Sequence, residues 1–252
     1  MTPMAISWGV FACVFGGALL GMMLRNVLPA HHLDPDSKDV VKLGMALIAT
    51  MSALVLGLLI ASAKSSFDAQ SGEVIQISAN IIQLDRILAR YGPETNEARD
   101  VLRRTVVSLD RNWSEDASRT AKLDSPATRA GGASFYEKIQ ALAPRNDFQR
   151  SIQGQALQIA FDLGRTRALL LEQSGSSIPT PFLVVLVFWL AVIFTSFGVF
   201  APCNATVIVT LLVCALSVSG AIFLILELDH PFGGLLQISD LPLRNALANL
   251  AP

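Results

Sequence analysis

The sequence predicts an all-α, polytopic membrane protein with four transmembrane helices in two pairs and a helical domain between the second and third helices. Two features of the chain support this fold class. Four long runs are apolar with almost no charge in their interiors, at residues 6–28, 40–63, 178–201 and 205–228. Each run is close to the ~20 apolar residues that cross the hydrocarbon core of a bilayer. The whole chain is 52% apolar and 15% charged, well below the ~25% charged residues of soluble domains.

The spacing of the runs also predicts the domain organisation. Residues 1–63 hold the first two transmembrane helices, 64–177 a helical domain, 178–228 the last two transmembrane helices and 229–252 an amphipathic tail. Paired crossings place both termini and the helical domain on one side of the membrane. Lys and Arg near the membrane ends favour the cytoplasm for that side by only four to three. The two sets are Lys64, Arg165, Arg167 and Arg244 against Arg25, Lys38 and Lys42.

Helical periodicity continues from the second run into the middle of the chain. Apolar residues recur at steps of four and three, which places them on one helical face: Ile77, Ile81, Leu84, Leu88 and Tyr91. No helix breaker separates this stripe from the membrane run, so we predict one helix that ends at Gly92-Pro93. The fixed φ of Pro93 and the acidic Glu94 favour the start of the next helix, which should end near Trp113.

Beyond that helix the sequence becomes polar and small. Residues 114–133 predict a loop, with Gly131-Gly132 as a break. A short helix is expected over 134–142 and a long one from about Asn146, capped by Gly175. In the tail, Ser239 is the predicted N-cap of a helix that lies on the membrane surface or on the middle helices. Its apolar side consists of Leu243, Leu247 and Leu250.

Several function classes are excluded or disfavoured. The net charge is −1, and residues 64–177 hold fifteen basic and fourteen acidic residues, which argues against nucleic acid as a partner. No catalytic motif or phosphate loop occurs, so an enzyme is not expected. The three cysteines form no disulfide or metal pattern, and the transmembrane runs lack the His that haem would need, so no cofactor is expected. His31 and His32 lie near three aspartates without a recognised ligand spacing. A turn and helix cap explains that cluster better than a metal site.

The second run has a face of small residues. Ala46, Ala49, Thr50, Ala53, Gly57 and Ala61 share about a third of the helix circumference, and Leu47, Met51, Val55 and Leu58 lie opposite. Close helix packing is the favoured explanation, because small residues let backbones approach in lipid. The alternative is a pore-lining face, with four candidates: Ala46, Thr50, Ala53 and Gly57. A polar stripe on the fourth run is better explained by packing and comprises Thr206, Thr210, Cys214 and Ser217.

Two carboxylates close the fourth run. Glu227 and Asp229 lie where the helix dipole prefers cations, so each needs compensation. The favoured explanation is a pair of structural anchors, and the alternative is an acidic ring at the cytoplasmic mouth of an oligomeric pore. Because Glu227 lies deeper, we expect it to be buried and structural. We expect Asp229 to be a solvated mouth residue that favours cations.

Three segments resemble the bacterial bestrophin-like membrane family: residues 84–94 (LDRILARYGPE), 202–204 (PCN) and 227–234 (ELDHPFGG). The resemblance covers essentially the whole chain to Leu247. It implies the two-plus-two layout in a bacterial inner membrane, with a cytoplasmic helical middle and tail. Through the likeness of this family to bestrophins, it also implies a homo-oligomeric, pentameric ion channel.

The second run departs from bestrophins, which narrow their pore with bulky apolar and aromatic side chains on this helix. It has no aromatic residue, and a neck would have to use Ile48, Met51 and Val55. The expected function is an oligomeric channel with a shared central pore that favours cations, with the lipid bilayer and ions as partners. The alternative is a non-conducting membrane scaffold or sensor whose helical domain binds a cytoplasmic partner.

Overall fold

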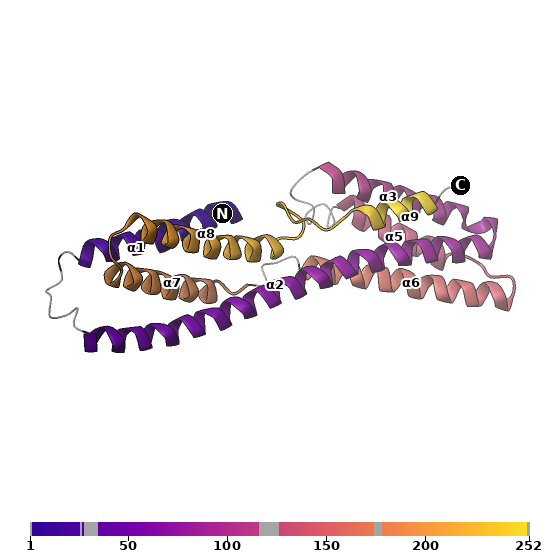
Figure 1. Cartoon of the computed structure of the whole chain (residues 1–252). Helices are drawn as coiled ribbons and strands as arrows, with labels where there is room; N and C mark the ends of the chain where they lie inside the picture. The colour runs from indigo at the N-terminus through magenta and orange to yellow at the C-terminus, as the bar shows by residue number, and fades with distance from the viewer. Residues whose placement is uncertain (1, 26, 28–34, 116–125, 174–177, 251–252) are drawn as a thin grey trace. The chain divides into compact units, whose positions relative to one another are not determined.

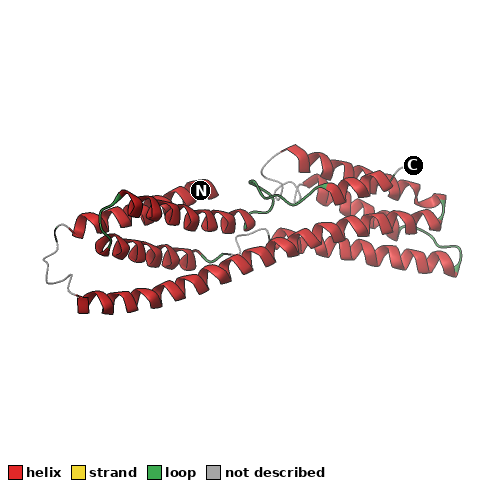
Figure 2. Cartoon of the chain, in the orientation of Figure 1, coloured by secondary structure: helices red, strands yellow, loops and turns green. Residues whose placement is uncertain are grey.

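The computed structural model describes residues 2–25, 27, 35–115, 126–173 and 178–250. Within these ranges the chain forms helices and loops and no strand (Figure 2). The elements in chain order (Figure 1) are α1 (Pro3–Arg25), α2 (Pro35–Tyr91), the 3-10 helix η2 (Pro93–Thr95), α3 (Asn96–Glu115), α5 (Pro126–Gln140), α6 (Asp147–Glu172), α7 (Thr180–Phe200), α8 (Ala205–Leu228) and α9 (Leu241–Asn249).

The chain divides into two compact units. The first, here the membrane unit, comprises Met1–Ser66 and Ser177–Asp229, and the second, the helical unit, comprises Phe67–Ser176 and His230–Pro252. Four helices are long and apolar enough to span a membrane: α1, α2, α7 and α8. This confirms the four predicted spans. The apolar parts of all four helices belong to the membrane unit.

Glycines bring α1 and α7 into direct backbone contact. A Cβ built on Gly21 of α1 would collide with the backbone oxygen of Thr195 in α7, and one on Gly198 of α7 would collide with the backbone oxygen of Ala18. A Cβ on Gly17 would lie 2.9 Å from the Thr195 hydroxyl oxygen. In lipid, where hydrophobic burial gives no preference between helix and lipid contacts, such close van der Waals packing drives association.

The remainder of the membrane unit packs around this contact. Val14 and Ala18 of α1, Leu186 of α7 and Ile222 and Ile225 of α8 are fully buried in one apolar cluster. At the far end of α1, Arg25 Nη1 donates to the carbonyl oxygen of Ala201 at 2.5 Å. That carbonyl lies at the C-cap of α7, where the helix dipole favours a cation.

In the helical unit, α2 ends where the sequence predicts. Gly92 adopts φ 132°, a conformation open to glycine and strained for other residues. The hydroxyl of Thr95 donates to the carbonyls of Leu88 and Gly92 at 2.7 and 2.8 Å. These bonds satisfy carbonyls that the helix end leaves without an intrahelical partner. The stripe from Ile77 to Leu88 then packs in the apolar cluster of this unit, and Tyr91 is buried as well.

A bidentate ion pair joins α2 to α3. Arg99 Nε donates to Asp85 Oδ1 at 2.7 Å, and Arg99 Nη2 donates to Asp85 Oδ2 at 3.0 Å. Asp85 is buried, and its hydrogen bonds raise the pKa of the Arg99 guanidinium. The two parallel bonds attract the opposite charges and also fix the orientation of the Arg99 side chain against Asp85.

The predicted loop over 114–133 is wrong from Pro126 onward, because α5 begins there. Pro126 occupies the first helical position, which a proline's fixed φ favours. Gly131 lies against α3, where an added Cβ would be 2.6 Å from the Thr105 hydroxyl oxygen. The glycine that looked like a helix break thus permits close packing of α5 on α3. Residues 116–125 and the predicted cap Gly175 lie outside the described residues.

The helix predicted from about Asn146 begins there, whereas the tail helix begins one residue later than the predicted cap Ser239 implies. Asn146 caps α6, and its side chain accepts from the Gln149 amide at 2.7 Å. The tail helix α9 packs against α3, with Leu243 and Leu250 buried, so it lies on the middle helices. The Ser239 hydroxyl accepts from the Leu241 amide at 3.2 Å, although the N-cap position itself belongs to Asp240.

The α1–α7 contact predicts that Gly21→Ala destabilises the membrane unit by about 1–3 kcal/mol, because the new methyl group forces two backbones apart. Gly16→Ala is the matched control, since a Cβ at Gly16 meets nothing within 4 Å. It should be neutral or stabilising by up to ~1 kcal/mol. Thermal unfolding of the two variants in mild detergent measures both effects. Equal midpoints would contradict the packing account.

Candidate functional site

Only one face of the apolar part of α2 is covered by the other helices of the chain. Leu59 and Ala63 are buried in the cluster of the membrane unit, together with partly buried Ile48 and Val55. Ser52 lies on the same face, and its hydroxyl donates to the Ile48 carbonyl at 2.8 Å. This bond keeps the polar group satisfied inside its own helix, as lipid requires. The covered face of α2 is therefore the one that includes two of the three neck candidates.

Most of the small face of α2 is left uncovered by the other described helices, although Ala46 and Ala49 line a cavity that also borders α7 and α8. All four pore-lining candidates, Ala46, Thr50, Ala53 and Gly57, are exposed. The Thr50 hydroxyl donates to the Ala46 carbonyl at 2.8 Å, and a Cβ at Gly57 would meet nothing within 4 Å. Beside this stripe lie the exposed side chains of Leu47, Leu54 and Leu58. In the described part of the chain Thr50, Ala53 and Gly57 thus stay exposed, and the shape of this surface allows either close helix packing or room for water.

A bulky neck is incompatible with the packing of Ile48 and Val55. Both pack toward the interior of the membrane unit, so the expectation that they could narrow a pore is wrong for this structure. Met51 is the one candidate of the three that is exposed, at 44%. The positions around the helix axis explain the difference. Ile48 and Val55 lie within 20° of each other, and Met51 lies about 40° further around the helix, away from the covered face.

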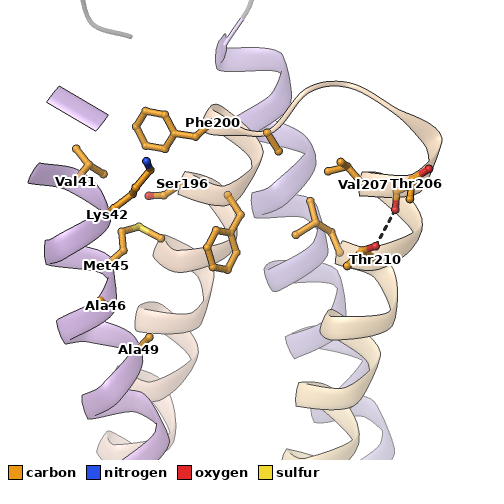
Figure 3. A pocket seen from close by; sticks show the side chains of 13 residues that line it. Val41, Lys42, Met45, Ala46, Ala49, Ser196, Phe200, Thr206, Val207 and Thr210 are labelled. Carbon is orange, nitrogen blue, oxygen red and sulfur yellow. Dashed lines mark hydrogen bonds between the residues drawn. The ribbon is translucent and has the colours of Figure 1, made fainter. Parts of the chain in front are cut away.

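A cavity of about 680 Å³ separates the start of α2 from α7 and α8 (Figure 3). Val41, Lys42 and Met45 line it from α2, and Phe200 and Thr206 line it from the other two helices. Figure 3 shows the Lys42 side chain between α2 and α7. Lys42 Nζ also lies 3.0 Å from Asp39 Oδ1 in an exposed ion pair. Sequence patterns do not reveal this cavity, because α2 is far from α7 and α8 in the sequence.

The polar stripe of α8 is exposed as well. Thr206, Thr210, Cys214 and Ser217 are all exposed, and the first two line the cavity that α8 shares with α2 and α7. The Thr210 hydroxyl donates to the Thr206 carbonyl at 2.9 Å, and the Ser217 hydroxyl donates to the Val213 carbonyl at 2.9 Å. The helix thus satisfies both hydroxyls by itself, and the stripe remains available for packing against a neighbour.

Both terminal carboxylates of α8 are buried. Glu227 and Asp229 are each 4% exposed, and both take part in interactions. Asp229 is the C-cap residue, and its amide donates to the Ile225 carbonyl at 3.0 Å. The expected burial of Glu227 is confirmed. The expected solvation of Asp229 is wrong, because the helical turn continues to Asp229 and the chain covers its side chain as well.

The remaining candidates lie elsewhere. His31, His32 and Asp34, whose spacing gave no metal pattern, fall outside the described residues. Among the residues that are described, no group of three or more His, Cys, Asp or Glu could hold a metal ion. The residues that sequence reasoning missed are Gly17 and Gly21, which fix the α1–α7 contact. Their spacing of four is the small-residue signature that could have identified them.

Comparisons with known proteins agree with the resemblance of the three sequence segments. The family model described as a Bestrophin-like domain matches residues 12–243. Three crystal structures of variants of a bacterial bestrophin homologue from Klebsiella pneumoniae are similar in fold. Their TM-scores are 0.66, 0.68 and 0.67 at 14%, 14% and 15% identity, and the matches cover 94%, 96% and 99% of this chain and 97%, 98% and 97% of those chains.

At such identities the structural matches establish the fold alone. No functionally curated protein matches the chain. The family match and the four apolar helices together make the chain an integral membrane protein. The chain belongs to the bestrophin-like domain family.

Proposed function

We propose that the chain is one subunit of a homo-oligomeric ion channel in which copies of α2 surround a shared pore. The observation that carries the proposal is the exposed small stripe of α2. Its residues Ala46, Thr50, Ala53 and Gly57 are exposed on one line along the helix, and Ala46 also borders the cavity of about 680 Å³. Small side chains on a pore-facing helix leave space for water and ions, and the proposal assigns them that role.

The coverage of the four spans supports an assembly. Only 17% of the most apolar window of α2 is buried in the single chain, against 39% for α1 and 28% for α7 and α8. One subunit of four spans cannot enclose a water path with a helix that its own neighbours barely cover. The exposed residues Cys214 and Ser217 of α8 offer a second contact surface for a neighbouring copy. A pentamer is the assembly that the bestrophin likeness favours.

The proposed orientation places residues 64–177, the tail and both termini in the cytoplasm of a bacterial inner membrane. The basic residues near the membrane favour it by four to three, and the bestrophin likeness adds to it. The turn at Pro202–Asn204 then faces the opposite side. The domain organisation proposed from the sequence, 1–63, 64–177, 178–228 and 229–252, follows the same layout.

Cation preference is the part of the proposal that rests on Glu227 and Asp229. They place two acidic groups at the end of α8, near the proposed cytoplasmic mouth. Because both are buried in the chain, they act on ions through their field rather than by direct contact. Low-dielectric surroundings strengthen such a field, and in this proposal it raises the local concentration of cations.

A non-conducting scaffold or sensor is the second candidate. It is favoured by apolar side chains of the helical unit that remain exposed, among them Ile75, Phe148 and Leu169. A cytoplasmic partner could cover them, as could a neighbouring subunit. Absence of ion flux from a correctly assembled oligomer in liposomes would favour the scaffold.

The pore assignment predicts that Gly57→Trp lowers ion flux in liposomes. An indole on the small stripe adds an apolar constriction, and the loss should be about tenfold or more. Leu58→Trp is the matched control at the same depth, because residue 58 points about 100° away and is already a large exposed side chain. It should conduct like the parent.

Both tryptophan variants must first match the parent in mass, measured in mild detergent against multiples of the 27.0 kDa chain. A parent that is monomeric in several mild detergents would remove the channel proposal. Equal flux through the two variants would remove the small stripe from the pore.

The orientation predicts different labelling of two cysteines by a membrane-impermeant maleimide in cells with a permeable outer membrane. Native Cys203 lies exposed at the turn between α7 and α8 and should react. In a Cys203→Ser chain, a cysteine introduced by Ala141→Cys lies on the exposed surface of the helical unit and should react only after lysis. The reverse pattern would invert the proposed topology.

The burial of both carboxylates predicts that Glu227→Gln and Asp229→Asn each destabilise the protein. A buried group that loses its partner costs on the order of 1–3 kcal/mol. The cation proposal adds that both variants shift the reversal potential under a salt gradient toward lower cation preference. Thermal unfolding and reversal potentials measure the two effects separately. Unchanged selectivity in two stable, conducting variants would refute the role of this pair in ion preference.

A further inference from the structure

The helical unit contains a second cavity that the channel proposal does not use. It has a volume of about 480 Å³ and lies among α2, α3, α5 and α6. Pockets for small molecules in proteins measure about 300–1,000 Å³, so this one is large enough for a ligand. Its deep wall is formed by Ile81, Leu102 and Val106, which belong to the buried cluster of the unit.

The rim of the cavity combines aromatic and cationic side chains. Phe161 and Tyr136 line it and are 62% and 40% exposed. Arg129, Arg165 and Arg167 line it as well, and no Asp or Glu is among its described lining residues. Arg129 and Arg167 take part in other interactions, and each guanidinium has five N–H donors to share.

We propose that this cavity binds a free long-chain fatty acid, with the acyl chain against the apolar wall and the carboxylate at the arginines. The wall offers an acyl chain only hydrophobic contacts, whose strength grows with the apolar area removed from water. The guanidinium is suited to a carboxylate, because its planar fork can donate two parallel bonds to both oxygens. An uncharged lipid would make no use of the positive charge at the rim, and a small inorganic anion would make no use of the apolar wall.

Substitutions at two glycines can fill the cavity without disturbing the fold. Gly164 of α6 and Gly132 of α5 line it, and a Cβ at either position would meet nothing within 4 Å. A leucine introduced there fills cavity space instead of colliding with a neighbour. Gly154 of α6 is equally open but does not line the cavity, so Gly154→Leu reports the effect of the same change on the helix alone.

The test uses the full chain in lipid nanodiscs and a palmitate analogue that carries a photoreactive diazirine on its acyl chain. Mass spectrometry then locates the labelled peptides. We expect labelling of the cavity peptides of α5 and α6 that excess palmitate abolishes. The methyl ester of the probe lacks the charge and should label these peptides about tenfold less, the factor that one lost charge-assisted bond produces.

The variants address the two halves of the site. Gly164→Leu and the double variant Arg129→Gln/Arg165→Gln should each lower cavity labelling by about tenfold. Gly154→Leu should label like the parent, and so should Arg150→Gln, which removes an exposed arginine of α6 outside the cavity. If circular dichroism shows that Gly164→Leu is misfolded, Gly132→Leu replaces it.

Labelling confined to the transmembrane helices would overturn the proposal, as would equal labelling by acid and ester. The proposal also fails if leucine at Gly164 and at Gly154 gives the same result. Cross-links from the cavity to a second subunit, with no fatty acid adduct, would show that a neighbouring copy covers it instead. None of these outcomes depends on ion flux, so the channel proposal can fail while this site stands.

Discussion

The backbone contact between α1 and α7 is the constraint on which the rest of the membrane unit depends. Gly17, Gly21 and Gly198 let the two helices approach more closely than any side chain would allow. In lipid this packing supplies association energy that hydrophobic burial cannot. With α8 packed into the same cluster, three spans satisfy one another. The remaining span, α2, contacts these three through one face only.

Because only one face of α2 is covered, its remaining surface is exposed to lipid, water or a neighbouring subunit. A helix with Ala46, Ala53 and Gly57 in one exposed line and leucines beside it presents two different surfaces to its surroundings. Leucines suit lipid tails or a neighbouring subunit, whereas the small stripe suits water or a close helix contact. The oligomeric channel accounts for both surfaces, and membership of the bestrophin-like domain family favours the same assembly.

Features that depend on a single residue or on the length of an apolar run were predictable from the sequence. The four spans, the end of α2 at Gly92, the start of α6 near Asn146 and the burial of Glu227 are confirmed. Each depends on length, on a positive φ, on a side-chain acceptor or on depth within a helix. The small stripe was identified from its periodicity, but only the structure shows that the chain leaves it uncovered.

The misses share a different cause, namely tertiary contact. Gly131 looks like a helix break, yet its lack of a side chain is what allows α5 to lie against Thr105 of α3. Ile48 and Val55 look like a pore neck, yet both pack against the apolar cluster of the membrane unit. Asp229 looks solvated from its place after the last apolar turn, yet it is buried. None of these contacts leaves a local pattern, and both cavities are likewise formed by segments far apart in the chain.

The central claim is that the small stripe of α2 faces the ion path, and substituted-cysteine accessibility tests it most directly. In a chain whose three native cysteines are replaced by serine, single cysteines replace Ala46, Ala53, Gly57, Leu47, Leu54 or Leu58. The measurement is the change in ion flux through reconstituted protein after a charged, water-soluble thiol reagent is added. The account predicts a response at Ala46, Ala53 and Gly57 and none at the three leucine positions. A response at the leucine positions alone would contradict it.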